Sequence, residues 1–157
     1  DFARRGYQIA VVALRLFHQR HPDQRIHVYG AAPRGLDVPH TFHGRLTTGQ
    51  LNDLYGRTIA GLAMSFTNIT LVAEEMLAVG NIPVVNDMAA AHFVLTSPHV
   101  RWAEPTALAL ANQLSEAVSA SDIESRSAAA AASVADRSWT PTMEAVVRIV
   151  EEEVYGS

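Results

Sequence analysis

Apolar side chains follow two different spacings along the first three quarters of the chain. In four segments they recur three and four positions apart, as in amphipathic helices: 4–20, 47–58, 69–79 and 105–119. Short apolar runs lie between these segments, and we predict them to be strands: 26–30, 40–44, 59–65, 82–85 and 100–104. Segment 89–95 fits a short helix and a strand equally well.

The spacing also predicts which side chains face the core. In the first helix the predicted inward residues are Ile9, Val12, Ala13, Leu16 and Phe17. In the helix over 69–79 they are Leu71, Val72, Met76 and Val79. The run over 59–65 is apolar almost throughout, as expected of a parallel strand that is covered on both sides.

The last part of the chain has a different composition. Residues 119–138 are rich in Ala and Ser, which favours a helix with little apolar face. A final helix is predicted over 141–155, with Met143, Val146, Val147, Val150 and Val154 on one side. We therefore expect a nucleotide-binding domain over 1–120 and a helical tail over 121–157, packed on that domain or on an N-terminal domain outside this chain.

Alternating helices and short apolar strands predict an α/β fold, a Rossmann-like parallel sheet with helices on both faces. Ligands of such sheets bind beyond the carboxyl ends of the strands, so the loops 30–39, 44–47, 65–69 and 86–89 are the candidates for a site. A strand would normally precede the first helix, and the chain is therefore expected to be an excised piece of a larger protein.

Composition excludes several classes of protein. The chain has 157 residues, 18% charged residues and a formal net charge of −4, so it lacks the basic excess of a nucleic-acid-binding protein. It has no cysteine, which excludes disulfides and thiolate metal sites. Its seven histidines show no helical metal-binding spacing, and no metal is expected. No apolar run is long enough to cross a bilayer.

Three groups of polar residues are candidates for binding. Thr67 and Asn68 follow a predicted strand and can cap the next helix, whose first N–H groups can also bind an anion. In that helix Glu75 borders the apolar stripe, and it can equally be a binding carboxylate or a surface charge. Glu74 is predicted to be solvated. Arg4 and Arg5 stand at the start of the first helix, where two cations suggest a bound phosphate or a solvated chain end.

Several segments together resemble the C-terminal half of a two-domain (GT-B) glycosyltransferase of the retaining family 4 type, over about residues 4–118. They are ARRG, IHVYG, FHGRLTTGQLNDLY and the run SFTNITLVAEEMLAVGNIPVVND. The last run resembles a donor-binding signature, in which a helix with Glu-x-x-x-x-Gly precedes a Pro-Val-Val strand. The Ser-x-Thr-Asn turn followed by Glu-Met is most similar to rhamnosyltransferases of bacterial surface polysaccharide synthesis.

The resemblance implies a role for individual residues. Glu75 would bind the ribose of a nucleotide diphosphate sugar, and Arg5 would neutralise the diphosphate in place of a metal. Thr67 and Asn68 would contact the donor sugar or the diphosphate. The remaining donor-binding residues implied by the resemblance are Gly30, Ala31, Leu46, Ser65, Phe66 and Leu71. Of these residues Arg5, Thr67 and Glu75 would be catalytic.

The chain departs from the family pattern in three ways, one of which is that the arginine that normally ends the first strand of the family is not in this chain. Thr67 stands where the first of two glutamates is expected, which a deoxy sugar such as rhamnose would tolerate. Asn81 adds one residue between Gly80 and Pro83.

The function expected is transfer of a sugar to a glycan or lipid-linked acceptor. The resemblance to rhamnosyltransferases suggests rhamnose as that sugar. The acceptor site would lie in the N-terminal domain, so this piece alone is expected to be inactive. We expect it in the cytoplasm, either free or peripheral at the inner face of the membrane. The alternative is a non-catalytic α/β module that binds a ligand or partner and is receiver-like, although Asp87 stands alone after its strand, where a receiver needs an acidic cluster.

Overall fold

Two small parallel sheets form the centre of the molecule, whose computed structural model describes residues 6–67 and 71–156. The first sheet pairs β1 (His27–Val28) with β2 (Thr41–Phe42). The second has the order β3-β4-β5, with bounds Ala60–Leu62, Ile82–Asn86 and Arg101–Ala103. The described chain is thus α/β with parallel strands and is consistent with a Rossmann-like fold, as the sequence predicts.

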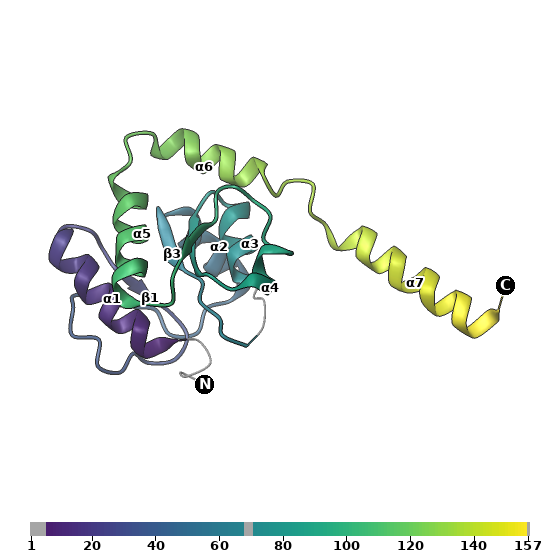
Figure 1. The fold of residues 1–157 in the computed structure, drawn as a ribbon, viewed down its shortest axis with the longest axis horizontal. Helices are drawn as coiled ribbons and strands as arrows, with labels where there is room; N and C mark the ends of the chain where they lie inside the picture. The colour runs from purple at the N-terminus through teal and green to yellow at the C-terminus, as the bar shows by residue number, and fades with distance from the viewer. Residues whose placement is uncertain (1–5, 68–70, 157) are drawn as a thin grey trace.

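Helices cover both faces of these sheets (Figure 1). On one face α1 (Tyr7–Arg20) packs along α5 (Ala107–Ser119), and their apolar side chains share a core with Val84 of β4. On the other face α2 (Thr48–Gly56) and α3 (Val72–Ala78) share a second core with Val85. Because adjacent side chains of a strand point to opposite faces, one short strand serves both cores.

The two sheets differ in how well their strands are covered. All five residues of β4 are buried, as predicted for the run over 82–85. In β3 all three residues are only half-buried, and the predicted run over 59–65 becomes buried only at Ala63, Met64 and Ser65. The run is therefore less buried than expected of a strand that is covered on both sides, and among the described residues β3 pairs with β4 alone.

Two inward-facing predictions in the helices are also wrong. Val12 is 43% exposed and Val11 is buried, whereas Ala13 and Phe17 are buried as predicted. Leu71 is 49% exposed because α3 begins only at Val72. The ambiguous segment 89–95 contains a short helix, α4 (Ala89–His92).

The Ala-rich part of the tail belongs to the domain. Helix α6 (Ile123–Ala132) packs against α3, and Ala130 and Val134 are buried in the same core. Gly80, which follows α3, has φ +80°, and a Cβ built there would lie 2.1 Å from Ser127 Oγ and 2.8 Å from the Ser127 carbonyl oxygen. Only a glycine can occupy this position without moving α6.

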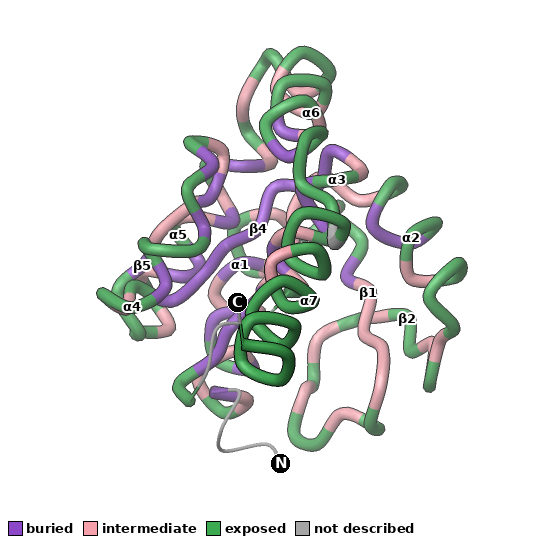
Figure 2. Tube along the Cα trace, turned by 90° about the vertical axis from the view of Figure 1, so that its right-hand side faces the viewer, coloured by how far each residue is buried: buried purple, intermediate pink, exposed green. Residues whose placement is uncertain are grey.

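The last helix, α7 (Trp139–Tyr155), extends away from the rest of the molecule (Figure 1). The helix itself is confirmed, but its predicted apolar side is uncovered: Met143, Val146, Val147, Val150 and Val154 are all exposed (Figure 2). Within the described residues, no helix is both long and apolar enough to span a bilayer.

Candidate functional site

The turn after β3 is held to the neighbouring strand by a buried asparagine. Asn86 Oδ1 accepts a hydrogen bond from the Ser65 backbone N–H, and Asn86 Nδ2 donates one to the Ser65 carbonyl, both at 2.8 Å. Ser65 and Asn86 are 5% and 2% exposed. This pair fixes the carboxyl end of β3 against that of β4, where ligands of parallel sheets bind.

The sequence interpretation did not single out Asn86. The available signal was a polar side chain at the end of an otherwise apolar run, IPVVN. Such a buried amide needs hydrogen-bond partners, and at a strand end the next backbone turn provides them.

The first turn of α1 lies directly against the same turn. Gly6 has φ +61°, and a Cβ there would meet Phe66 Cε2 at 2.4 Å and Met64 Cε at 2.8 Å. The N-terminus of α1 therefore touches the carboxyl end of β3. Among the described residues Gly6 is the N-cap of α1 and provides no side-chain cap, and the first turn has no acidic residue. The N-terminus of α1 is therefore a place where backbone N–H groups can donate hydrogen bonds to an anion.

The loop after β1 reaches the start of α1 through Tyr7. The Tyr7 hydroxyl donates to the Arg34 carbonyl oxygen at 3.0 Å and accepts from the Arg34 backbone N–H at 2.5 Å. Gly30 and Ala31 belong to this loop, and their predicted place at the carboxyl end of a strand is correct. Leu46 is half-buried just before Thr47, the N-cap of α2.

The two adjacent glutamates of α3 have exchanged the environments predicted for them. Glu74 is the partly buried one, with its side chain 22% exposed, and it forms an ion pair with Arg137 from the segment after α6. Glu75, predicted to border the apolar stripe, is exposed. The prediction of a solvated Glu74 is wrong, because a partner 63 residues away covers it.

The predicted cap at Thr67 and Asn68 falls at a segment, 68–70, that lies outside the described residues. In the structure α3 begins at Val72, with Leu71 as N-cap, so Thr67 lies several residues before the first turn. Thr67 itself is exposed and follows Ser65 and the 39%-exposed Phe66 at the edge of the sheet. Asn68, Arg4 and Arg5 lie outside the described residues.

Two tyrosines form a partly buried pair on the α2 side of the sheets. The hydroxyls of Tyr29 and Tyr55 are 2.6 Å apart, and their rings meet edge to face. Burial raises the pKa of the Tyr55 phenol, and the hydrogen bond to Tyr29 and the negative charge of Glu75 raise that pKa further. The charge of Glu75 therefore acts on the Tyr55 phenol. That phenol is hydrogen-bonded to Tyr29, which lies just before the loop that follows β1.

Asp87 does not stand alone after β4. Its carboxylate is 2.7 Å from His92 Nε2, and the His92 ring stacks on Trp102 with centroids 3.8 Å apart. A carboxylate that orients an imidazole suits it for acid–base work. Sequence reasoning treated His92 only as one of seven histidines, because a pairing across five residues and a short helix has no distinctive spacing.

His43 is half-buried and pairs with His27. Their ring nitrogens, Nδ1 of His27 and Nε2 of His43, are 2.9 Å apart. Burial lowers the pKa of His27, and so does the proximity of His43. In the parts of the chain that the structure describes, no three His, Asp or Glu side chains gather in a way that could hold a metal ion.

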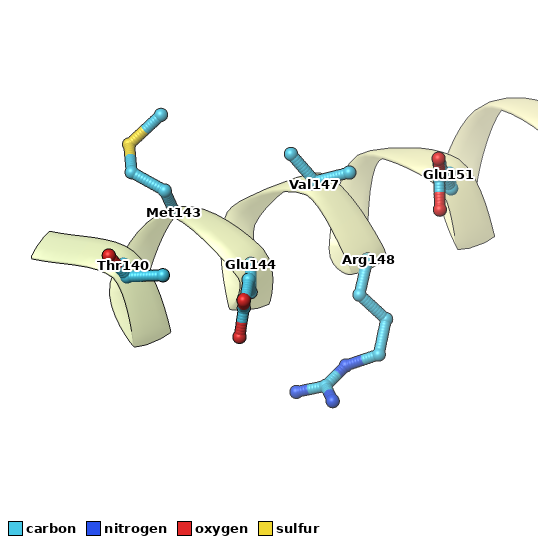
Figure 3. Close-up of a pocket in the computed structure, with 6 residues that line it drawn as sticks. All are labelled: Thr140, Met143, Glu144, Val147, Arg148 and Glu151. Atoms are coloured by element: carbon cyan, nitrogen blue, oxygen red, sulfur yellow. The ribbon is translucent and has the colours of Figure 1, made fainter.

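A separate hollow of about 460 Å³ lies along α7. All of its lining residues come from that helix, and Figure 3 shows Met143 and Arg148 pointing to opposite sides of the ribbon. One helix gives the hollow a wall on one side only, so it cannot enclose a small ligand. The carboxyl edge of the sheets remains the candidate site.

Comparison with known proteins gives no family for the chain: no protein-family model matches it, and no curated protein matches its sequence significantly. The functional argument therefore depends on the residues at the carboxyl edge of the sheets. Those are the turn at Ser65, Phe66 and Thr67, the start of α1 at Gly6, and the loop after β1.

Proposed function

We propose that the chain is the donor-binding half of a GT-B glycosyltransferase. It would bind a nucleotide diphosphate sugar, with rhamnose as the preferred sugar, for transfer to a glycan or lipid-linked acceptor. The acceptor would be held by a second, N-terminal domain, and this half alone would not catalyse transfer.

One observation carries the proposal: three segments converge at the carboxyl edge of the parallel sheets. Gly6 lies against Phe66 and Met64, and Tyr7 is hydrogen-bonded to Arg34. The first turn of α1 thus lies between the turn after β3 and the loop after β1. Backbone N–H groups in such a place suit a diphosphate, and the two loops suit the sugar and the base on either side of it.

The side chains available at this edge fit the parts of such a donor. Glu75 is exposed, so its carboxylate can accept hydrogen bonds from both hydroxyls of a ribose. Tyr55, whose phenol is held protonated by burial and by Tyr29, lies near that carboxylate. Ser65, Phe66 and Thr67 would contact the sugar, and Arg5 and Asn68 would contact the diphosphate; the roles of the last two remain predictions from the resemblance.

Calorimetric titration tests the proposal, with dTDP-rhamnose, UDP-glucose and free dTDP as probes and about 5 mM EDTA present to exclude a metal contribution. We expect binding of the nucleotide diphosphates, weakened at least about tenfold in Glu75→Ala, which is about 1.4 kcal/mol. Glu74→Ala is the matched control, because it removes the adjacent carboxylate and the Arg137 pair but should leave the affinity within about twofold.

Two outcomes would contradict the proposal. If the folded chain binds none of the three probes, the non-catalytic module becomes the better reading. If Glu74→Ala weakens binding as much as Glu75→Ala, the effect comes from the packing of α3 and not from a ribose contact. A lipid-linked acceptor would also place the whole enzyme in the cytoplasm at the inner face of the membrane, and fractionation of cells that express the full-length protein measures this.

A further inference from the structure

An apolar cavity of about 830 Å³ separates the two sheets, and we call it the inter-sheet slot. Its walls are residues 23–29 along β1 and residues 57–64 along β3. Phe17 of α1 and Leu114 of α5 close one face, and Val72 and Met76 of α3 close the other. The slot is therefore bounded by a strand edge on each side and by helices above and below.

The two strand edges that face the slot have backbone groups pointing into it. In β1 the carbonyls of Ile26 and Val28 accept hydrogen bonds from β2, at 2.8 and 2.9 Å. Because backbone groups of successive residues in a strand alternate between its two edges, the N–H and C=O of His27 and Tyr29 point the other way, toward the slot.

The same alternation holds in β3. The Ile59 carbonyl accepts from Ile82 N–H at 3.0 Å, and Ala63 N–H donates to the Val84 carbonyl at 2.9 Å. The backbone groups of Ala60 and Leu62 therefore point away from β4 and toward the slot. Backbone groups in an apolar setting require hydrogen-bond partners, and a ligand without a regular row of donors and acceptors cannot satisfy both edges.

Both edges run in the same direction. The amino-terminal ends of the walls are residues 23–25 and 57–59, and the carboxyl ends are marked by Tyr29 and Met64. The start of α1 contacts the carboxyl ends of both, through Gly6 on Met64 and through Tyr7 on the loop that follows β1. An extended segment in the slot can therefore pair in parallel with both strands at once.

We propose that the inter-sheet slot binds one extended apolar β-strand of about six residues, the span of the wall at 59–64, attached to the N-terminal side of α1. That strand would end where α1 begins, and α1 would be its crossover helix to β1. It would join the two sheets into one, in the order β2-β1-new strand-β3-β4-β5. The inference is independent of the proposed function.

The chemistry of the slot sets the composition of its occupant. Helices cover the slot on both faces, so both sides of the strand would be buried and all its side chains would be apolar, as is typical of central parallel strands. The half-buried state of β3 has the same explanation: the sequence of β3 is that of an interior strand, but within the part of the chain that the structure describes it pairs with β4 alone. An unpaired apolar edge of this kind otherwise invites aggregation.

The test compares the 157-residue chain with the same chain carrying six alternating Val and Ile residues fused directly before Asp1. We expect the fusion to raise Tm by at least about 4 °C and to slow amide hydrogen exchange at His27, Tyr29, Ala60 and Leu62 at least about tenfold. The control fusion replaces alternate residues with Pro, which keeps the segment apolar but removes every second N–H donor. It should protect none of these amides.

The proposal is overturned if both fusions have the same effect, or if neither protects the amides on the slot side. It is also overturned if protection appears only in a concentration-dependent dimer, because the strand would then come from a second copy. Should the strand fusion be insoluble, the free six-residue peptide is added to the unfused chain and the same four amides are followed. Unchanged amide exchange at the highest soluble peptide concentration would then overturn the proposal.

Discussion

Asn86 binds the backbone of Ser65 at two points, so a single side chain fixes the turn that ends β3. Both hydrogen bonds are 2.8 Å long and both residues are buried. The pair joins neighbouring strands beyond their last ladder bond. It therefore determines where the polar turn stands relative to the start of α1.

Replacement of this asparagine should destabilise the domain. Asn86→Ala leaves a buried N–H and a buried carbonyl of Ser65 without these partners, and we expect a loss of about 2 kcal/mol or more in the free energy of unfolding, measured by urea titration. Asn52→Ala on the exposed surface of α2 is the control and should change stability by less than about 0.5 kcal/mol. Equal effects of the two substitutions would contradict the role given to Asn86.

Gly6 and Gly35 allow conformation and crowding to be separated. Both have positive φ, +61° and +68°, but a Cβ at Gly6 would meet Phe66 and Met64, whereas a Cβ at Gly35 meets nothing within 4 Å. Gly35→Ala should cost about 1 kcal/mol for backbone conformation alone, and Gly6→Ala about 1–3 kcal/mol more for crowding.

A double variant checks that interpretation. Adding Phe66→Ala to Gly6→Ala should recover part of the crowding cost, whereas adding it to Gly35→Ala should recover nothing. Additive behaviour in both pairs, seen by thermal unfolding, would mean that the start of α1 is not pressed against the turn after β3.

The adjacent glutamates of α3 should differ in what they contribute to the stability of the protein, as well as in what they contribute to binding. Glu74→Gln weakens the ion pair with Arg137, and we expect the free energy of unfolding to fall by up to about 1 kcal/mol, less at high salt. Glu75→Gln should leave stability within about 0.5 kcal/mol, since its side chain is exposed. A larger loss from Glu75→Gln than from Glu74→Gln, in urea unfolding at low salt, would reverse this assignment.

The histidine pair predicts a pH dependence of stability. The folded state lowers the pKa of His27 below its ordinary value of 6.5, chiefly by burial and then by the proximity of His43. Below pH 6.5 the unfolded chain therefore binds more protons at this site than the folded chain does, and the free energy of unfolding should fall as the pH falls. Above that pH the contribution should be constant.

Urea unfolding at about pH 7.5 and about pH 5.5 measures this effect. The difference between the two pH values should shrink in His27→Asn, which removes the titrating group, and should persist in His40→Asn, which leaves the pair intact. If His27→Asn keeps the full pH dependence, the acid-sensitive group is elsewhere in the chain.

Truncations distinguish the two parts of the tail. Removal of residues 139–157 takes away a helix whose apolar side chains are exposed, and Tm should change by less than about 2 °C. Removal from residue 123 onward also takes away buried Ala130 and Val134 and should lower Tm by several times that amount. Equal effects would show that α7 stabilises the domain after all.

The sequence predicted the fold better than it predicted the surroundings of individual side chains. Periodicity located nearly every helix and strand, because spacing is a local property. It misassigned Val12 and could not detect that β3, among the described residues, pairs with β4 alone. Glu74 was misjudged for a related reason: Arg137 lies 63 residues away, and spacing within α3 carries no information about it.

The loops at the carboxyl edge were correctly chosen as the candidates, since that follows from the topology of any parallel sheet. The contacts that hold these loops together were not predicted. Asn86 on Ser65 and Tyr7 on Arg34 each join segments more than 20 residues apart. Nothing in the local pattern of either residue indicates its partner.

The close packing of Gly80 on Ser127 has a consequence for the Ala-rich helix α6. The second half of α6 is a run of five Ala, 128–132, which alone has few features to prevent the helix from sliding by one turn, about 5.4 Å. The missing side chain at Gly80 leaves space that the Ser127 hydroxyl and carbonyl oxygen occupy. The axial position of α6 is thus set partly by a glycine in the domain to which it docks, together with the hydrogen bond that Arg126 Nη2 of α6 donates to the Ala117 carbonyl at 2.7 Å.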